Sequence, residues 1–289
     1  MTAEFPLSKK LAAEALAMTL FVWIGCGTAV ASQKSHTLSL LLITTQSIDV
    51  IRDATGTQAS FLIATSLAFG IGIAVLVYTI APISGGHINP AVTLSLLAIG
   101  EISPVHAAAY IVVQFLFAIL GAALVWGSMN HLIVRESQEG DPPFLLGVNT
   151  VDSGISSGSA FLLEFLGTFL LVWTVCTTAV SKISIAGNAA PLAIGFSVLL
   201  AHLCLIPFTG CGINPARAFG PMIMNIAYGE PVGHEGWWVY YTAPFIGGPL
   251  AALIQKYIFT LPDEEDSEPK QLDDGEHAPT PVETPTAEE

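Results

Sequence analysis

Residues 84–91 read SGGHINPA, and residues 209–217 return to the same pattern as TGCGINPAR, 125 positions later. In each copy, glycines precede an Asn that can cap a helix, and a Pro follows at the first helical position, where its missing N–H costs nothing. We therefore expect a short helix after each copy, over residues 90–99 and 215–227. Two copies of Gly-x-x-Asn-Pro-Ala imply two structurally equivalent sites.

Both expected helices are apolar but too short to cross a bilayer. A half-helix that begins inside a membrane leaves its first N–H groups unpaired and points the positive end of its dipole inward. Water in a lumen can accept those hydrogen bonds. A single Asn-Pro-Ala is typical of an ordinary turn, but two copies that each follow a long apolar span favour a functional pair.

The composition predicts a membrane protein. Of the 289 residues, 52% are hydrophobic and 11% are charged, and the mean hydropathy is +0.65. Six apolar stretches are each long enough to cross a hydrocarbon core of roughly 30 Å. They are residues 11–31, 61–83, 107–127, 160–180, 189–208 and 237–254. Six crossings place both termini on the same side of the membrane.

The charges indicate how the chain is oriented. Most of the net charge of -14 lies in residues 263–289, where 11 acidic side chains stand against Lys270. Lysines on the side of the termini outnumber basic residues on the other side, which favours cytoplasmic termini. All four cysteines lie in or beside apolar spans, so a disulfide framework is not expected. We therefore expect a multi-pass protein of the plasma membrane or of an internal membrane.

Two glutamates lie inside apolar spans at corresponding places. Glu14 in the first span is echoed by Glu164 in the fourth, and three spans plus one half-helix make up each half of the chain. Because each half has an odd number of crossings, the second copy is inverted in the membrane. An intramembrane carboxylate is functional by default, and a proton relay is one reading. We favour anchoring, because the re-entrant loops need acceptors for their free N–H groups.

The domain organisation follows from these spans. We expect a cytoplasmic N-terminus at residues 1–10, a channel domain at 11–260 with inverted repeats at about 11–127 and 160–256, and a disordered, acidic, Pro-rich cytoplasmic tail at 261–289. Residues 32–60 and 128–159 are expected to be long outer connections. Residues 181–188 form a short inner loop.

The duplicated Asn-Pro-Ala motifs, the Glu14/Glu164 repeat and NPARAFGP at residues 214–221 resemble the aquaporins of the major intrinsic protein family, over roughly residues 8–260. The resemblance implies an all-α membrane protein in which six transmembrane helices and two re-entrant half-helices form an inverted repeat. It also implies a homotetramer with one pore per monomer. The pore motifs are then Asn89, Pro90, Ala91, Asn214, Pro215 and Ala216.

The expected geometry predicts passage of water without protons. As N-caps, Asn89 and Asn214 would each turn an amide donor into the lumen, while two positive helix ends face the same point. A passing water offers its oxygen there, and its hydrogens then point toward the two exits. That orientation breaks a continuous chain of donors, and the dipole field repels hydronium.

The resemblance also places a selectivity filter at Phe69, His202, Cys211 and Arg217. Phe69 would supply a bulky apolar wall, His202 and Arg217 would supply donors, and Arg217 would repel cations. Glycerol-conducting relatives place a small residue at the His202 position and Asp after the Arg, where this chain has Ala218, so both positions favour water. Cys211 is expected to expose its thiol to the lumen, which predicts block by mercurials.

Three alternatives stay open at this point. The first is a broader channel for hydrogen peroxide, glycerol, urea or ammonia. The second is a proton-coupled transporter with Glu14 and Glu164 as relays. The third is a junction protein whose outer loops adhere to another membrane. No motif of an enzyme, a metal site or a nucleic-acid-binding protein is present, and no cofactor is expected.

Overall fold

The computed structural model describes residues 5–43, 50–136, 146–229 and 236–260, and gives the backbone alone at 33–43, 50–57 and 130–136. The described residues form helices joined by turns. The helices are α1 (Leu7–Ile43), α2 (Val50–Ser84), α3 (Pro90–Ala98), α4 (Pro104–Glu136), α5 (Ser157–Val175), α6 (Ala190–Thr209), α7 (Pro215–Ala227) and α8 (Val239–Ile258), with a π-turn at Cys176–Val180 and a 3₁₀ turn at Gly187–Ala189. The expected acidic tail at 261–289 lies outside the described residues.

Within the described residues, five helical stretches are long and apolar enough to cross a membrane. They are Leu7–Ser32, Gln58–Ser84, Pro104–Met129, Ser157–Val180 and Gly187–Thr209. The sixth long helix, α8, has 20 residues but carries Tyr240, Tyr241, Gln255 and Lys256, which lower its mean hydropathy. The helices α3 and α7, with 9 and 13 residues, are the two short ones that the Asn-Pro-Ala motifs predict.

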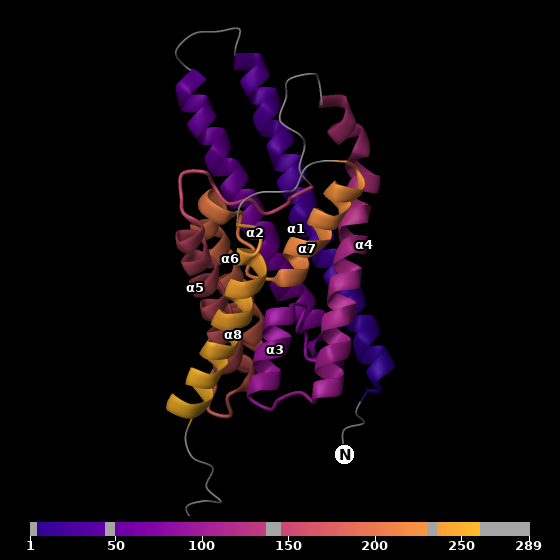
Figure 1. Ribbon diagram of the computed structural model, residues 1–289, viewed down its shortest axis with the longest axis vertical. Coiled ribbons are helices and arrows are strands. Elements are labelled where there is room, and N and C mark those ends of the chain that lie inside the picture. Colours follow the sequence, from indigo (N-terminus) through magenta and orange to yellow (C-terminus); the bar gives the residue numbers. More distant parts are fainter. Residues whose placement is uncertain (1–4, 44–49, 137–145, 230–235, 261–289) are drawn as a thin grey trace, which may run out of the picture. The chain divides into compact units, whose positions relative to one another are not determined.

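The helices pack as two related halves. In the first half α1 packs on α2 and α4, and in the second α5 packs on α6 and α8. Each half-helix lies against the last helix of the other half, because α3 contacts α8 and α7 contacts α4. Figure 1 shows α3 and α7 between α8 and α4. The fold is therefore an all-α inverted repeat, as predicted.

The halves meet at a close crossing of α2 and α6. A Cβ on Gly70 would lie 2.9 Å from the carbonyl oxygen of Gly195, and a Cβ on Gly195 would lie 2.6 Å from the carbonyl oxygen of Gly70. These two glycines occupy equivalent places in the repeat, 125 residues apart. Side chains at either position would push apart the helices that carry Phe69 and His202.

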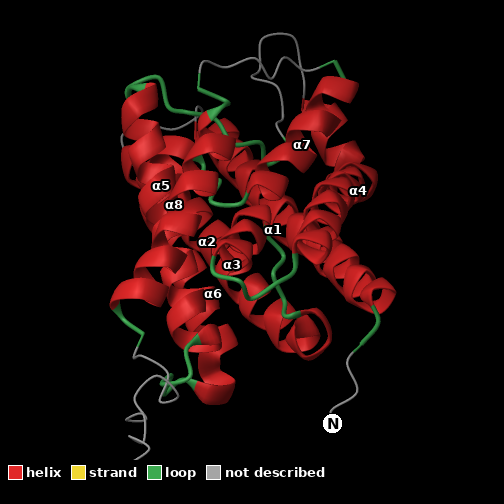
Figure 2. Ribbon diagram, turned by 60° about the horizontal axis from the view of Figure 1, so that its bottom comes forward, coloured by secondary structure: helices red, strands yellow, loops and turns green. Residues whose placement is uncertain are grey.

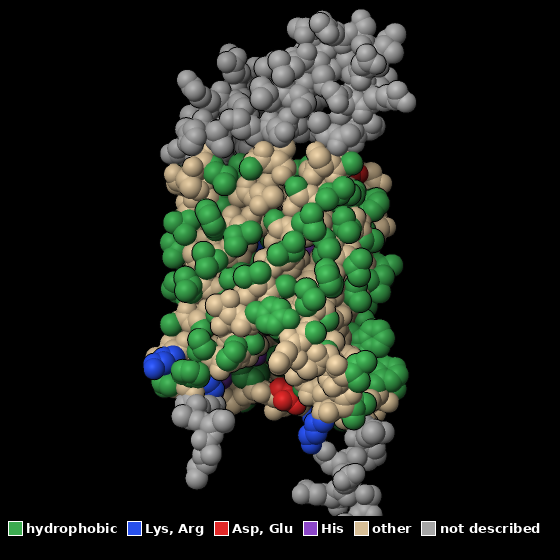
Figure 3. All heavy atoms as spheres, turned by 180° about the vertical axis from the view of Figure 1, so that it is seen from behind, with side chains coloured by type: hydrophobic (Ala, Val, Ile, Leu, Met, Phe, Trp, Pro, Cys, Tyr) green, Lys and Arg blue, Asp and Glu red, His purple; other side chains and the backbone are tan. Residues whose placement is uncertain are grey.

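The described ends of the chain lie at one end of the bundle. Figure 1 shows α1 beginning and α8 ending at the bottom of the view, which we call the lower end; the opposite end is the upper end. Figure 2 shows the bundle turned so that the lower end comes forward. In Figure 3 hydrophobic side chains cover the visible flank, and most of the coloured charged side chains lie near the lower end. This distribution is that of a protein embedded in a bilayer.

The long outer connections are shorter than expected. The sequence predicts a connection over residues 32–60, but α1 continues to Ile43 and α2 begins at Val50. Residues 32–43 contain neither Gly nor Pro and include three consecutive leucines, so nothing in them stops a helix. Likewise α4 continues to Glu136, inside the expected connection 128–159. The predicted bounds of both connections were therefore wrong.

Candidate permeation site

Each half-helix begins at its Asn-Pro-Ala motif. Asn89 accepts a hydrogen bond at Oδ1 from the backbone N–H of Ala91 over 2.8 Å. Asn214 accepts from the N–H groups of Ala216 and Arg217 over 3.1 and 3.2 Å. Both caps are extended in backbone conformation and both helices begin with Pro, as the sequence predicts. Two positive helix ends therefore start at the paired loops.

Glu14 is fully buried and accepts hydrogen bonds from four groups. Its Oε1 accepts from the Ser84 hydroxyl over 2.8 Å and the His87 N–H over 2.9 Å. Its Oε2 accepts from the Ile88 N–H over 2.8 Å and from Gln114 Nε2 over 3.0 Å. Three of these four donors belong to the segment that leads into the first Asn-Pro-Ala motif.

Glu164 holds the second loop in the corresponding way. It is fully buried and accepts from the Thr209 hydroxyl over 2.6 Å, and from the N–H groups of Gly212 and Ile213 over 2.8 and 2.6 Å. These three donors stand 125 residues after Ser84, His87 and Ile88.

The two loops are bonded to each other through their asparagines. Asn89 Nδ2 donates to the carbonyl oxygen of Ile213 over 2.9 Å, and Asn214 Nδ2 donates to the carbonyl oxygen of Ile88 over 2.8 Å. We expected each asparagine to turn its amide donor into the lumen. One of the two N–H groups of each amide instead joins the loops, and the amide retains a second N–H for a further acceptor.

Those carbonyl groups are set by an unusual backbone. Ile88 and Ile213 have φ angles of 51° and 42°, a region that a β-branched residue rarely adopts. The N–H of each isoleucine donates to a buried glutamate, and its carbonyl accepts from the opposite asparagine. Strain of this kind persists only where surrounding contacts over-determine the conformation, which these hydrogen bonds do.

Two tyrosines support the same loops, a role that the sequence alone did not predict. The Tyr110 hydroxyl donates to the carbonyl oxygen of Ser84, and the Tyr240 hydroxyl donates to that of Thr209, both over 2.8 Å. Tyr110 lies on α4 and Tyr240 on α8, which are equivalent in the repeat. Matching polar residues in the two halves of the sequence are the signal that could have identified this pair.

The four residues assigned to the filter are buried, and three of them touch one another. The rings of Phe69 and His202 stack with centroids 4.4 Å apart, and Arg217 Cζ lies 4.7 Å from the Phe69 centroid. Phe69 comes from α2, His202 from α6 and Arg217 from the first turn of α7. Residues far apart in the sequence thus form one cluster on the upper side of the paired loops.

His202 presents an acceptor where we expected a donor. Its Nδ1 lies 2.9 Å from the carbonyl oxygen of Val198, and because a carbonyl can only accept, Nδ1 carries the proton of the neutral ring. The Nε2 atom is buried without a partner among the described residues and is then an acceptor. The donors of the filter are left to Arg217, whose Nε is likewise buried without a partner.

We expected the thiol of Cys211 to be exposed to the lumen. Cys211 instead has no solvent exposure. It stands at a φ angle of 56°, and its N–H donates to the Thr209 hydroxyl over 3.2 Å. All four cysteines are free, and Cys204 is the exposed one.

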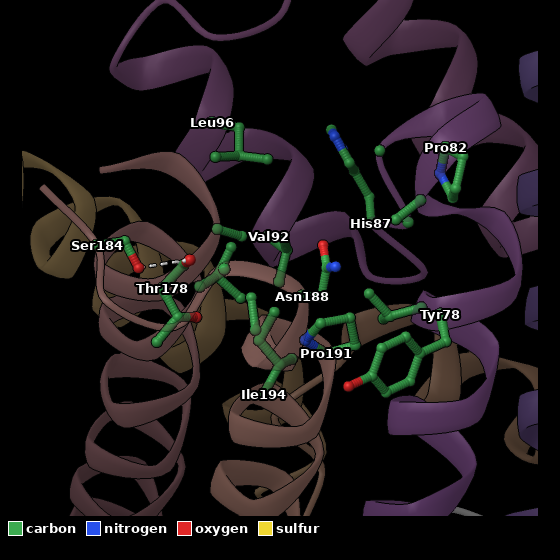
Figure 4. A pocket seen from close by; sticks show the side chains of 18 of the residues that line it. Tyr78, Pro82, His87, Val92, Leu96, Thr178, Ser184, Asn188, Pro191 and Ile194 are labelled. Atoms are coloured by element: carbon green, nitrogen blue, oxygen red, sulfur yellow. Dashed lines mark hydrogen bonds between the residues drawn. The ribbon is translucent and has the colours of Figure 1, made fainter. Parts of the chain in front are cut away.

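Two cavities approach the paired loops from opposite ends. The lower cavity has a volume of about 700 Å³ and reaches His87 and Val92, and Figure 4 shows it surrounded by side chains of α2, α3, α6 and the segment after α5. The upper cavity has a volume of about 740 Å³ and reaches Gly210 and Arg217. The asparagines and the Phe69 cluster lie between these two cavities, where a permeant would be most confined.

The chain matches the family Major intrinsic protein over residues 1–255. Aquaporin-1 from Sus scrofa is 39% identical over 261 residues, which are 89% of this chain and 86% of that protein. Aquaporin-1 from Homo sapiens is 38% identical over 263 residues, with the same two shares. The X-ray structure of the aquaglyceroporin from Plasmodium falciparum superposes with a TM-score of 0.71 at 19% identity, over 88% of this chain and 97% of that one. The last likeness concerns the fold alone.

Proposed function

Because this chain belongs to the major intrinsic protein family and is an integral membrane protein of the aquaporin type, we propose that it is a passive, water-selective channel. The family consists of channels and not of enzymes, so the residues at the paired loops act by contact and charge. Water would move down an osmotic gradient, and protons and other ions would be excluded.

The observation that carries the proposal is the joined pair of capped loops between two cavities. Two positive helix ends and the free N–H groups of Asn89 and Asn214 favour a neutral permeant that offers an oxygen. A cation that has lost its hydration shell there meets two positive helix ends. The buried carboxylates Glu14 and Glu164 each accept three hydrogen bonds from the loop before an Asn-Pro-Ala motif, which supports anchoring and not a proton relay.

The filter residues support water over glycerol. The ring centroids of Phe69 and His202 lie 4.4 Å apart. A single water could pass after a small displacement of the Phe69 ring, whereas the carbon chain of glycerol would require a much larger displacement. Arg217 offers donors and His202 Nε2 offers an acceptor, and one water can satisfy both. The guanidinium also places a fixed positive charge at the narrowest point, which disfavours cations.

The assembly and the orientation are part of the proposal. A homotetramer with one pore per chain fits the apolar side chains exposed on the outer flanks, including Leu16, Leu162 and Leu166. Cytoplasmic termini fit the positive-inside rule, because Lys9, Lys10 and Lys182 belong to segments of the lower end. Chemical cross-linking in membranes tests the homotetramer. Protease access to a terminal tag in sealed vesicles tests the cytoplasmic location of the termini.

The channel is tested by osmotic shrinkage of proteoliposomes that contain the full chain. We expect water flux that rises linearly with the osmotic gradient, changes little with a pH gradient, and far exceeds that of empty liposomes. A saturable flux coupled to pH would indicate a transporter built on Glu14 and Glu164. A permeability no greater than that of empty liposomes would contradict the channel and leave the adhesive alternative.

A further inference from the structure

The repeat gives each filter residue a counterpart in the other half of the chain. The counterparts lie 125 positions away, which is the spacing between the two Asn-Pro-Ala motifs. In the order Phe69, His202, Cys211 and Arg217, they are Ile194, Val77, Gly86 and Val92. All four counterparts line the lower cavity, and we call them the lower ring.

The members of the two sets that belong to the loops and half-helices have matching backbones. Gly86 has a φ angle of 69° and Cys211 has a φ angle of 56°, both in the left-handed region that an L side chain rarely adopts. Val92 and Arg217 are each the third residue of a half-helix that begins with Pro. These counterparts are therefore equivalent in structure as well as in sequence position.

The crossing of α2 and α6 relates the other members. Its two central glycines approach each other's carbonyl oxygens, so the helices occupy equivalent places on either side of the crossing. Phe69 on α2 and Ile194 on α6 stand one residue before the glycine. Val77 on α2 and His202 on α6 stand seven residues after it. As Phe69 meets His202 on the upper side of the loops, Ile194 and Val77 come to the corresponding places on the lower side.

The lower ring presents a glycine and aliphatic side chains to the lower cavity. A Cβ on Gly86 would lie 3.3 Å from Val77 Cγ1, so these two members are neighbours. The side chains of Val77, Val92 and Ile194 are 4–5% exposed and belong to the hydrophobic core. Figure 4 shows Val92 and Ile194 at the cavity. No side chain of the ring can donate or accept a hydrogen bond.

The two sets also differ in bulk. In the filter, the centroids of the Phe69 and His202 rings lie 4.4 Å apart. In the lower ring, an isoleucine and a valine stand at the places of these aromatic rings, and the cavity of about 700 Å³ reaches all four members. The bulk of two aliphatic side chains therefore limits the lumen at this level.

We propose that the lower ring is a second specificity-determining position, placed below the paired loops as the filter is placed above them. The inference rests on the proposed water channel and deepens it. Since the ring offers no hydrogen bond, the bulk of its side chains alone decides what passes. Small side chains at Val77 and Ile194 leave the selection by size to the Phe69 cluster, and larger ones would turn the ring into a second filter.

The first test starts from F69A/H202A, in which the filter is opened to glycerol. V77H/I194F is added to it, which gives the lower ring the same pair of residue types as the filter. The matched control adds V75H/L192F, with the same residue types on the same helices two positions earlier. Val75 and Leu192 are 56% and 44% exposed, and neither lines the lower cavity. Glycerol permeability of the full chain in proteoliposomes is divided by the amount of inserted protein.

We expect V77H/I194F to lower the glycerol permeability of F69A/H202A by at least about tenfold, because glycerol must then displace side chains that fill its path. The control V75H/L192F should leave it unchanged. A selection by size that is lost at the filter would thus be regained on the opposite side of the loops.

The second test avoids large side chains in a packed core. I194C and L192C are treated with a bulky methanethiosulfonate, beside wild type treated in the same way, and the extent of labelling is measured by mass spectrometry. Labelled I194C should lose most of its water permeability, because the added group occupies the lumen at the lower ring. Labelled L192C and treated wild type should keep theirs.

An inserted chain with V77H/I194F that passes glycerol as well as F69A/H202A would overturn the inference. So would an I194C chain that cannot be labelled, or one that conducts water normally when labelled. If the chain with V77H/I194F does not insert, or if F69A/H202A excludes glycerol, the labelling of I194C decides alone. A wild-type chain without water permeability would overturn the proposed function itself, which is a different outcome from a conducting wild type with an unaffected I194C.

Discussion

Asn214 Nδ2 donates to the carbonyl oxygen of Ile88 over 2.8 Å, across 126 residues of sequence and between the two halves of the fold. The equivalent bond runs from Asn89 Nδ2 to the carbonyl oxygen of Ile213 over 2.9 Å. Each asparagine therefore does two things, since its Oδ1 caps its own half-helix and its Nδ2 holds the opposite loop. The capped helix ends are kept facing one another by side chains that line the proposed pore.

The two tasks of Asn214 can be separated by substitution. In N214D the carboxylate still caps α7, but the donor to Ile88 is lost and a negative charge faces that carbonyl. We expect a destabilisation of about 1–2 kcal/mol, seen as a lower thermal unfolding temperature in detergent. We also expect cation leakage in proteoliposomes, because the charge offsets the positive helix ends. N214D channels as stable and as cation-tight as wild type would contradict this account, and N214A, which loses the cap as well, should be less stable still.

Glu164 is expected to matter for stability and not for proton transfer. In E164Q the amide N–H₂ must face either Gly212 or Ile213, whose buried N–H groups then lose an acceptor. Each unsatisfied N–H costs about 1–3 kcal/mol, so the unfolding temperature should fall clearly. The water permeability of each folded channel should be retained, and proton flux should stay at the wild-type level. A proton flux that is present in wild type and absent in E164Q would show that the carboxylate is a relay.

Gly25 is expected to set the position of the Phe69 ring. A Cβ on Gly25 would lie 2.1 Å from Phe69 Cε1, so G25A must push the ring toward His202 and narrow the lumen. We expect water permeability per channel to fall several-fold. The matched control is G27A, where the atom nearest to the added Cβ would be the flexible end of Met129, 3.1 Å away, and permeability should be kept. Equal permeability in the two variants would mean that Phe69 does not limit the flow.

Mercurial block should be slow and should act through Cys211. The thiol is fully buried, so mercuric ion reaches it only when the surrounding side chains move. Inhibition of water flux should therefore develop gradually, and C211S should resist it. C204S is the control, because Cys204 is exposed and its modification should leave the flux unchanged. Equal sensitivity of C211S and wild type would contradict the assignment of Cys211 to the filter.

The repeated motif allowed most of the fold to be predicted from the sequence. Cap chemistry is local, so Asn89 and Asn214 with the prolines after them predicted where α3 and α7 begin. The expected end of α7 at residue 227 is the observed one. The buried glutamates could be predicted because a carboxylate in an apolar span needs donors, and the re-entrant loops have N–H groups to donate.

What could not be predicted depends on contacts between distant segments. The hydrogen bond from Arg217 to Asn149 joins residues 68 positions apart. Asn149 lies in a segment without hydrophobic periodicity, so the sequence pattern does not place it. The bond from His202 Nδ1 to Val198 decides which ring nitrogen faces the filter, and residue type alone leaves that open. The Ser and Thr content of residues 32–43 and 50–60 favours a connection, although the absence of Pro lets both helices continue through them.

The most direct test of the account is stopped-flow light scattering on proteoliposomes, comparing water and glycerol permeability in wild type and in the double variant F69A/H202A. We expect fast water and negligible glycerol permeability in wild type. We expect a marked gain of glycerol permeability in the variant, because two of the three side chains of the Phe69 cluster are cut back to Ala. Wild-type glycerol permeability comparable to that of water, or a variant that still excludes glycerol, would contradict the assigned filter.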